Sequence, residues 1–476
     1  MSRGVGMSAT RRVVVCALLA LGLLGTTAGP ALAHATLLSS TPKLNGRGVA
    51  ENTHAVTLRF SEPVEVLNRS DVTVVNGRGQ RQDIGGGHTM PGDPTRVVIP
   101  VHTPLLPMSY TVRYRVVSAD SHAATEAYVF GVGHAQLASP ILAGSGGLTD
   151  ESPVAVAARA LELIALGLLL GLLAFRLLVF GPAIAGARGL SAEDRQEVVR
   201  RGQSSFWRAF WALTVLAGIA ETAILVAKSA VVFHQGLLAA LVDPSSAYRL
   251  VSASRFGDLL GWRMAALMAL VAVGFLAWTT ERAEAPSAAG RRALMAPMGV
   301  FGLAALTALA DQGHASQAPL APVQVMADAI HLAGAAIWLG GLPILAAILL
   351  RAPRALPDGG RTLASATLRR FSKVALWSVV AIAVTGLARL VGELDSPAQL
   401  VTTGYGRDLM LKASLLAPIL VLARRNRQMV AALAGGLTPT AARLRTVARS
   451  VQIELGIGVG IIIIAAILVA QLPGRA

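Results

Sequence analysis

Cysteine is nearly absent from this sequence. The single cysteine, Cys16, lies in an apolar run close to the start of the chain that we expect to be removed during export. The exported protein would then contain no disulfide and no thiolate. Any metal site must therefore use histidine, methionine, carboxylate or backbone ligands.

Charged residues are scarce as well. They make up 14% of the 476 residues, whereas hydrophobic residues make up 54%, and the mean hydropathy of +0.59 is too high for a soluble globular protein. The charges are also unbalanced, with a formal net charge of +16. Such a charge can indicate nucleic-acid binding, but the positions of the basic residues indicate a membrane topology, so no nucleic-acid partner is expected.

Residues 1–33 have the features of a signal peptide. Basic residues at the start (Arg3, Arg11 and Arg12) precede an apolar run over 13–24, and residues 31–33 (Ala-Leu-Ala) have the small-x-small form of a cleavage site. Cleavage there makes His34 the first residue. Its free amine and its ring can chelate one metal ion, and such nitrogen donors suit Cu(II). The alternative is that His34 is an ordinary residue beside a cleavage site.

Residues 34–133 are predicted to form an antiparallel β-sandwich. Short runs alternate between apolar and polar residues, as in 55–60, where Val56, Leu58 and Phe60 share one face. Gly, Pro and Asn separate these runs, which is typical of a sandwich or barrel of about 100 residues. Residues 134–152, rich in Gly and Pro, are predicted to be a linker.

Residues 153–476 are predicted to form an all-α membrane domain. Spans of roughly 20 apolar residues are what a bilayer core requires. The sequence offers about eight, at 154–180, 209–233, 258–279, 294–311, 323–350, 371–392, 408–423 and 450–472. Pro343 is expected to kink or end the fifth, and Pro418 weakens the seventh.

The loops between these spans differ in charge. If the β domain is exported, the first span runs inward, and the loops that follow the first, third, fifth and seventh spans lie inside. Of the arginines and lysines in the loops and the tail, most lie in these inner loops. The positive-inside rule therefore predicts a multi-pass plasma-membrane protein whose N-terminal domain faces the periplasm or the exterior.

Two further candidate metal ligands follow the run 110–117. Asp120 and His122 alternate by two, so they share one face if the strand continues. With the two nitrogens of His34 they supply three nitrogens and one oxygen, a set that fits tetragonal Cu(II). Glu62, at the end of another run, could add an oxygen. The alternative is that Asp120 caps a turn and His122 is a surface residue.

The motifs around these residues resemble those of the CopC copper-binding family. They are HATLLSSTP at 34–42, LRFSEPV at 58–64 and YRVVSADSH at 114–122. The resemblance covers residues 34–133 and implies a cupredoxin-like Greek-key β-sandwich that binds Cu(II) outside the membrane. It also implies that His34, Asp120 and His122 are the ligands and that Glu62 lies at or near the site.

The membrane half resembles the CopD family. The motifs are HLAGAAIWLGGL at 331–342, TGL at 385–387 and YGRDLMLK at 405–412, and the resemblance covers about residues 153–472. The whole chain thus resembles a CopC–CopD fusion. Such a resemblance implies a role in copper uptake, copper homeostasis or copper resistance.

Several polar residues fall within the predicted spans, where they are costly and indicate function. Asp328 and His331 are spaced i, i+3 and share a helix face, and His314 precedes them in an outer loop. They could bind copper, relay protons or form a structural pair. Met264 and Met268 could bind Cu(I) through their sulfur atoms, although paired methionines usually pack. The membrane domain could carry Cu(I) or Cu(II).

Three functions are compatible with these features. The first is a copper importer without enzymatic activity. Nothing resembles a nucleotide-binding loop, so the metal gradient, the membrane potential or protons would drive it. The second is a membrane oxidoreductase or electron-transfer module holding haem or copper, but paired axial histidines are lacking in the predicted spans. The third is a copper monooxygenase, which Asp120 as an extra ligand disfavours. We expect the importer.

Overall fold

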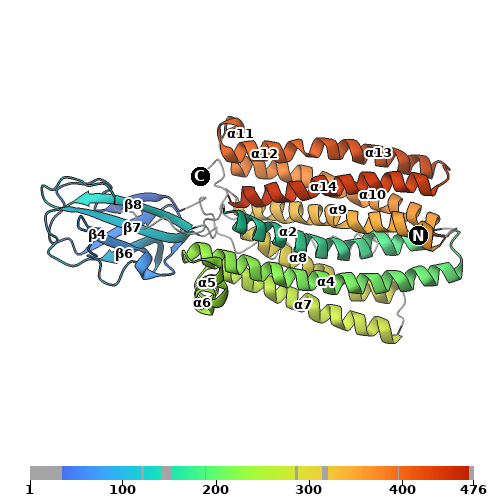
Figure 1. Ribbon diagram of the computed structural model, residues 1–476, viewed down its shortest axis with the longest axis horizontal. Coiled ribbons are helices and arrows are strands. Elements are labelled where there is room, and N and C mark those ends of the chain that lie inside the picture. The colour runs from blue at the N-terminus through green and yellow to red at the C-terminus, as the bar shows by residue number, and fades with distance from the viewer. Residues whose placement is uncertain are drawn as a thin grey trace, which may run out of the picture.

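The computed structural model describes residues 35–118, 123–140, 152–187, 189–284, 288–313, 320–356, 359–394 and 396–470. A β domain is followed by a long helical bundle, with the β domain at one end of the bundle (Figure 1). The predicted signal peptide lies outside the described residues, as does most of the predicted linker.

The β domain consists of two antiparallel sheets. The strands are β1 (Leu37–Thr41), β2 (Ala55–Phe60), β3 (Val64–Glu65), β4 (Thr73–Asn76), β5 (His88–Met90), β6 (Asp93–Pro100), β7 (Ser109–Ser118) and β8 (Ala123–Gly131). One sheet has the order β1-β2-β6-β5; in the other, β7 pairs with β3, β4 and β8. The connections β2–β3, β4–β5 and β6–β7 cross between the sheets, so the predicted sandwich is confirmed.

The core of the sandwich comes from the alternation seen in the sequence. Val56, Leu58 and Phe60 are almost fully buried, which confirms that they share one face of β2. The Phe60 ring packs edge-on against Tyr114 of β7, with centroids 5.4 Å apart. This contact joins the two sheets, since each ring comes from a different one.

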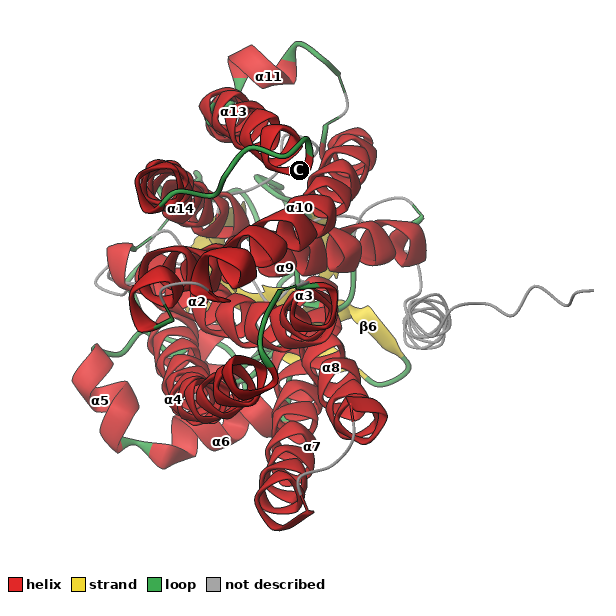
Figure 2. Cartoon of the chain, turned by 90° about the vertical axis from the view of Figure 1, so that its right-hand side faces the viewer, coloured by secondary structure: helices red, strands yellow, loops and turns green. Residues whose placement is uncertain are grey.

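The bundle is all-helical, as predicted. Its elements are α2 (Pro153–Ala174), a π-helical segment (Phe175–Phe180), α3 (Gly181–Gly186), α4 (Ala192–Val232), α5 (Leu237–Val242), α6 (Pro244–Ser252), α7 (Arg255–Glu284), α8 (Ala288–Asp311), α9 (Ala321–Ala355), α10 (Gly359–Glu393), α11 (Gln399–Thr402), α12 (Gly404–Ser414), α13 (Leu416–Ala434) and α14 (Ala441–Ala470). Viewed end-on, α2 and α9 lie between a group containing α4, α7 and α8 and a group containing α10, α13 and α14 (Figure 2).

Six helices among the described residues are long and apolar enough to cross a membrane. They are Pro153–Gly186, Ala192–Val232, Arg255–Arg282, Ala321–Ala355, Gly359–Leu390 and Ala441–Ala470. The predicted span 294–311 corresponds to a shorter apolar helix, Met295–Asp311. The predicted span 408–423 is divided between α12 and α13 at Leu415. Pro343 does not end its helix, because α9 continues to Ala355.

Glycine permits a close approach of two central helices. A Cβ atom on Gly171 of α2 would lie 2.5 Å from the Ala336 carbonyl oxygen and 2.6 Å from the Gly340 Cα of α9. Any larger residue would push the two backbones apart. The small residues therefore set the spacing of the two central helices.

Candidate functional site

The described residues beside the predicted metal ligands of the β domain lie near one another at one end of the sandwich. His34, Asp120 and His122 lie outside the described residues, but the residues beside them are described. Thr36 donates its N–H to Ser61 Oγ (3.0 Å) and accepts from Ser61 N (2.9 Å). Across the other sheet, Val64 pairs with Ser118, and Val117 pairs with Ala123. The segment after position 34 and Ser118, the residue before 119–122, thus both adjoin the β2–β3 connection.

Glu62 lies in that same β2–β3 connection. Its side chain is buried, with 1% of the residue exposed. Burying a carboxylate is costly unless hydrogen bonds, a cation or a metal compensates it. A buried acid placed in this connection is compatible with the metal site that the sequence predicts there.

The same end of the sandwich contacts the membrane bundle. Val117 packs into an apolar cluster with Val232, Leu250, Phe256 and Leu260 of the bundle. Arg115 of β7 donates to the carbonyl of Val231 at the end of α4. Arg115 and Val117, which make these contacts, lie close to Ser118, the last residue described before 119–122.

Glu65 of β3 adds a polar contact to this interface. Its Oε1 accepts a hydrogen bond from the N–H of Arg255, the first residue of α7, at 3.0 Å. The Arg255 side chain binds Asp311 at the end of α8 (3.1 Å). Burial raises the pKa of Glu65 to about 7, with Asp258 adding to the rise and Arg255 opposing it.

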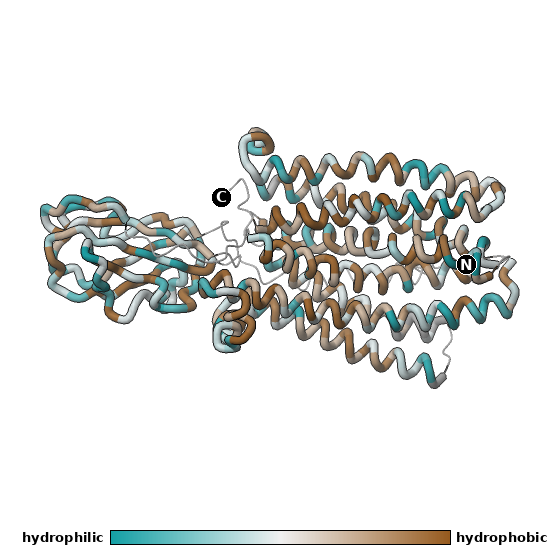
Figure 3. Tube along the Cα trace, viewed as in Figure 1, coloured by the Kyte–Doolittle hydropathy of each residue, from teal (hydrophilic) through white to brown (hydrophobic). Residues whose placement is uncertain are grey.

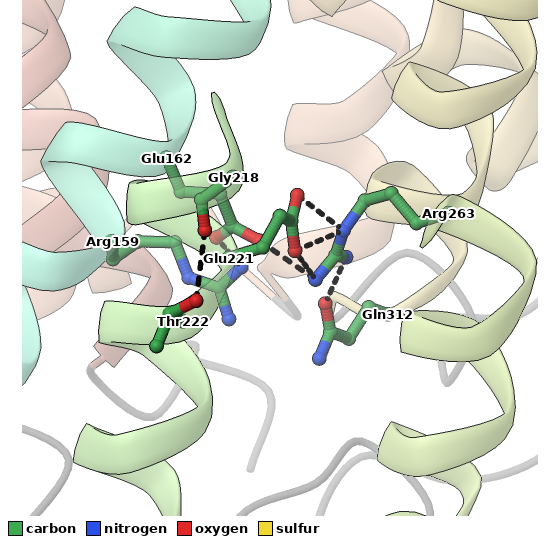
Figure 4. A network of polar contacts seen from close by, with 7 residues as sticks. All are labelled: Arg159, Glu162, Gly218, Glu221, Thr222, Arg263 and Gln312. Carbon is green, nitrogen blue, oxygen red and sulfur yellow. Dashed lines mark hydrogen bonds and ion pairs between the residues drawn. The ribbon is translucent and has the colours of Figure 1, made fainter. Parts of the chain in front are cut away.

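A buried ionic network lies within the bundle (Figure 4). Arg263 of α7 is fully buried and binds Glu162 of α2 (2.8 Å) and Glu221 of α4 (2.8 Å). Arg263 Nη1 also donates to Gln312 Oε1 (2.8 Å), and Arg159 binds Glu162 (2.6 Å). The network joins α2, α4 and α7 with the residue that follows α8, and its charges are closely compensated.

A second network joins α9, α10 and α12. Arg389 binds Asp328 (2.6 Å) and Glu393 (2.7 Å), and Tyr405 donates its hydroxyl to Glu393 Oε2 (2.7 Å). Asp328, predicted as a ligand, relay or ion-pair member, is therefore engaged by a cation. Glu393 and Tyr405 were not predicted as site residues, because only the pairing of Arg389 with Asp328 of another helix brings them into this network.

His331 lies one turn deeper than Asp328, ten residues into α9, or roughly 15 Å at 1.5 Å per residue. Its Nδ1 lies 3.2 Å from Thr385 Oγ1, and the Thr385 hydroxyl donates to the Ala381 carbonyl at 2.6 Å. Since the hydroxyl proton is used there, Thr385 accepts from the His331 Nδ1–H. The lone pair of the ring is then on Nε2, the arrangement that a metal ligand requires.

His331 lines a cavity of about 810 Å³ between α2, α9, α10, α12 and α14. Several polar residues line this cavity. They are Arg159, Asp328, His331, Arg389, Glu393, Tyr405 and Lys412. Met410, which was not predicted, also lines it. Most of the remaining wall is apolar.

The predicted methionines Met264 and Met268 are not brought to this cavity. Met264 and Met268 lie on α7, are 36% and 68% exposed, and do not line it. His314 lies outside the described residues. Among the residues that are described, no three His, Cys, Asp or Glu side chains form a group that could hold a metal ion. Metal binding in the membrane domain therefore stays a prediction.

Three family models match consecutive parts of the chain. Residues 37–133 match the CopC domain, 149–321 match the copper resistance protein D-like N-terminal domain, and 365–468 match copper resistance protein D. The copper transport protein CutJ of Bacillus subtilis (strain 168) is 27% identical over 444 residues, which cover 91% of this chain and 73% of that protein.

Two solved structures are similar to part of the chain. CopC from Methylosinus trichosporium OB3b is 24% identical, covering 22% of this chain and 98% of that one with a TM-score of 0.19. PcoC, a methionine-rich copper resistance protein from Escherichia coli, is 28% identical, covering 21% and 99% with a TM-score of 0.18.

Proposed function

The chain belongs to the CopC–CopD copper proteins, and from this premise we propose that it captures Cu(II) outside the plasma membrane and imports copper. The matched families are copper resistance families, and the curated relative is a copper transport protein; none is described as an enzyme. Binding and transport of copper in homeostasis or resistance is thus the function of the chain, and import is the direction we propose.

The outer site is proposed to use the amine and ring of His34, the carboxylate of Asp120 and the ring of His122, with Glu62 at or near the metal. The observation that supports the proposal is that the described residues next to these positions, Thr36 and Ser118, both adjoin the β2–β3 connection at the end of the sandwich that contacts the bundle. Nitrogen and oxygen donors in this number suit Cu(II). Copper released from this end would enter the bundle without crossing the sandwich.

His331 is proposed to receive copper inside the bundle, with His314 nearer the mouth. Its Nε2 is the atom left free to bind by the Thr385 hydrogen bond, and Met410 in the same cavity supplies a sulfur that would suit Cu(I). Arg389 and Lys412 also line the cavity. The carboxylates of Asp328 and Glu393 would balance these positive charges, so they would not serve to attract a copper ion.

The proposed orientation places the β domain outside. In Figure 3, hydrophilic residues gather at the helix ends farthest from the β domain. Arg200 and Arg201 near the start of α4, Arg354 near the end of α9 and Arg424 in α13 are among them. Basic residues mark the cytoplasmic side of a membrane protein, which supports an exterior β domain.

A cellular copper-accumulation assay tests the import route. His331→Ala should lower accumulation while the protein remains in the membrane at its normal level, because the proposed inner ligand is lost. Thr385→Val should lower it too, whereas Thr385→Ser, which keeps the hydroxyl, should not. His102→Ala, at an exposed position of the β domain, is the matched control. Unchanged accumulation in the His331 variant would remove His331 from the route.

A further inference from the structure

A second cavity lies near the other end of the bundle. It has a volume of about 440 Å³, which is within the range of about 300–1,000 Å³ typical of small-ligand sites. Residues of α3, α10 and α13 form its walls. Four of them are basic: Arg369, Arg370, Lys373 and Arg427.

The charge of this cavity is not balanced by carboxylates. No acidic side chain lines it, and within the described part of the chain no ion pair joins any of the four cations to Asp or Glu. Arg369 donates to Ser365 Oγ (2.6 Å) and Arg370 donates to the Leu178 carbonyl (2.8 Å), so neutral groups hold these two in place. Lys373 and Arg427 are exposed. Four cations around one hollow attract an anion.

The cavity lies where the helices change from polar to apolar. The apolar stretch of α10 begins beside Lys373, and that of α12 and α13 ends a few residues before Arg427. Leu376, Val430 and Ala431 supply apolar walls next to the cations. Trp377, beside Leu376, is 72% exposed, and tryptophan is enriched at the membrane–water interface. The cavity is thus at the depth of lipid headgroups.

We propose that this cavity binds the phosphate-bearing headgroup of an anionic phospholipid. The cations receive the phosphate, and the apolar wall receives the start of the acyl chains. Basic pockets between transmembrane helices on the cytoplasmic side recognise such headgroups. A free phosphate would contact the cations alone, whereas a phospholipid would contact both the cations and the apolar wall. The geometry therefore favours the lipid.

The test measures thermal unfolding of the full chain in neutral detergent. Added phosphatidylglycerol should raise the Tm more than the same amount of phosphatidylcholine does, and glycerol 3-phosphate should not reproduce the rise. Lys373→Gln with Arg427→Gln should weaken the apparent phosphatidylglycerol affinity roughly 30-fold, from the typical contribution of each cation near an anionic lipid. Both side chains are exposed, so the variant should fold.

Arg424→Gln with Arg425→Gln is the matched control. It also removes two exposed charges, from α13, but neither residue lines the cavity, so the phosphatidylglycerol response should persist. Equal responses in the two double variants would overturn the proposed site, and a full Tm rise with glycerol 3-phosphate would overturn the lipid as its ligand. Native mass spectrometry of the unaltered protein gives a separate check: equal retention of the two lipids would also overturn the proposal.

Discussion

At the scale of single residues, the proposed function depends most on the position of His34. Only as the first residue does it offer an amine as well as a ring. Both groups must be deprotonated to bind Cu(II), so affinity should also fall as the pH drops through the imidazole range. The residues beside it, Ala35 and Thr36, are held against β2, where Thr36 is bonded to Ser61.

An added N-terminal residue should therefore weaken Cu(II) binding. A protein that begins with one alanine before His34 keeps the ring but replaces the amine by an amide, which is not a comparable ligand. The apparent affinity should fall by at least about tenfold, as expected for a disturbed metal site. Titration of Cu(II) into the two forms measures it, and an added residue after Pro140, outside the matched CopC domain, is the control. Equal affinities would contradict the proposed ligand set.

A second prediction at the residue scale concerns Arg263. Removing it by Arg263→Leu leaves Glu162 and Glu221 without the cation that lies between them. Breaking a buried ion pair typically costs about 3–5 kcal/mol of unfolding free energy. Unfolding in detergent should show this loss, whereas Arg208→Leu, at an exposed position of α4, should have little effect. Similar stabilities for the two variants would show that the network is not a structural requirement.

At the scale of elements, the sequence predicted those strands and helices that carry a periodic pattern or a long apolar run. The alternation of Val56, Leu58 and Phe60 identified β2, and apolar length identified the six long helices. The two-residue strand β3 carries no periodic signal. Hydropathy likewise does not show that α12 and α13 separate at Leu415, because apolar residues lie on both sides of the break.

The candidate site was predicted only in part, because a local sequence pattern does not show which residues of different helices come into contact. His331 and Asp328 are recognisable because they are polar residues within one apolar span. Their partners Thr385 and Arg389 come from another helix, so their pairing requires the tertiary structure. Met264 and Met268 share a helix face, but spacing along one helix does not show whether that face points into the bundle.

The close crossing of α2 and α9 predicts that a larger residue at position 171 destabilises the protein. Gly171→Ala places a Cβ atom against the α9 backbone, which cannot withdraw as a flexible side chain could. Overpacking of this kind typically costs about 1–3 kcal/mol. Gly218→Ala on α4, where a Cβ would meet nothing within 4 Å, should instead be neutral or stabilise the helix by up to about 1 kcal/mol. Thermal unfolding of the two variants compares them, and a neutral Gly171→Ala would show that the helices can separate freely.

At the scale of the whole molecule, the contact between the β domain and the bundle is the route by which the proposed outer site would deliver copper. The contact combines an apolar cluster around Val117 and Phe256 with two hydrogen bonds, made by Arg115 and Glu65. Of the groups that make these contacts, Glu65 is the one whose charge changes near neutral pH, since burial in the docked protein raises its pKa to about 7.

Docking should therefore weaken as the pH rises. Glu65 has an ordinary pKa of 4.5 when exposed and about 7 when docked, so the docked form binds the proton more tightly. The contribution that proton binding by Glu65 makes to docking is fully favourable below pH 4.5, is lost progressively up to about pH 7, and stays absent above that value. Energy transfer between dyes on cysteines introduced at the exposed Ser39 and Tyr248 would follow docking in a chain whose single native cysteine, Cys16, lies in the predicted signal peptide. Glu65→Gln should abolish this pH dependence, and Glu51→Gln, an exposed control in the same domain, should retain it. A pH profile shared by the native chain and Glu65→Gln would show that another group governs docking.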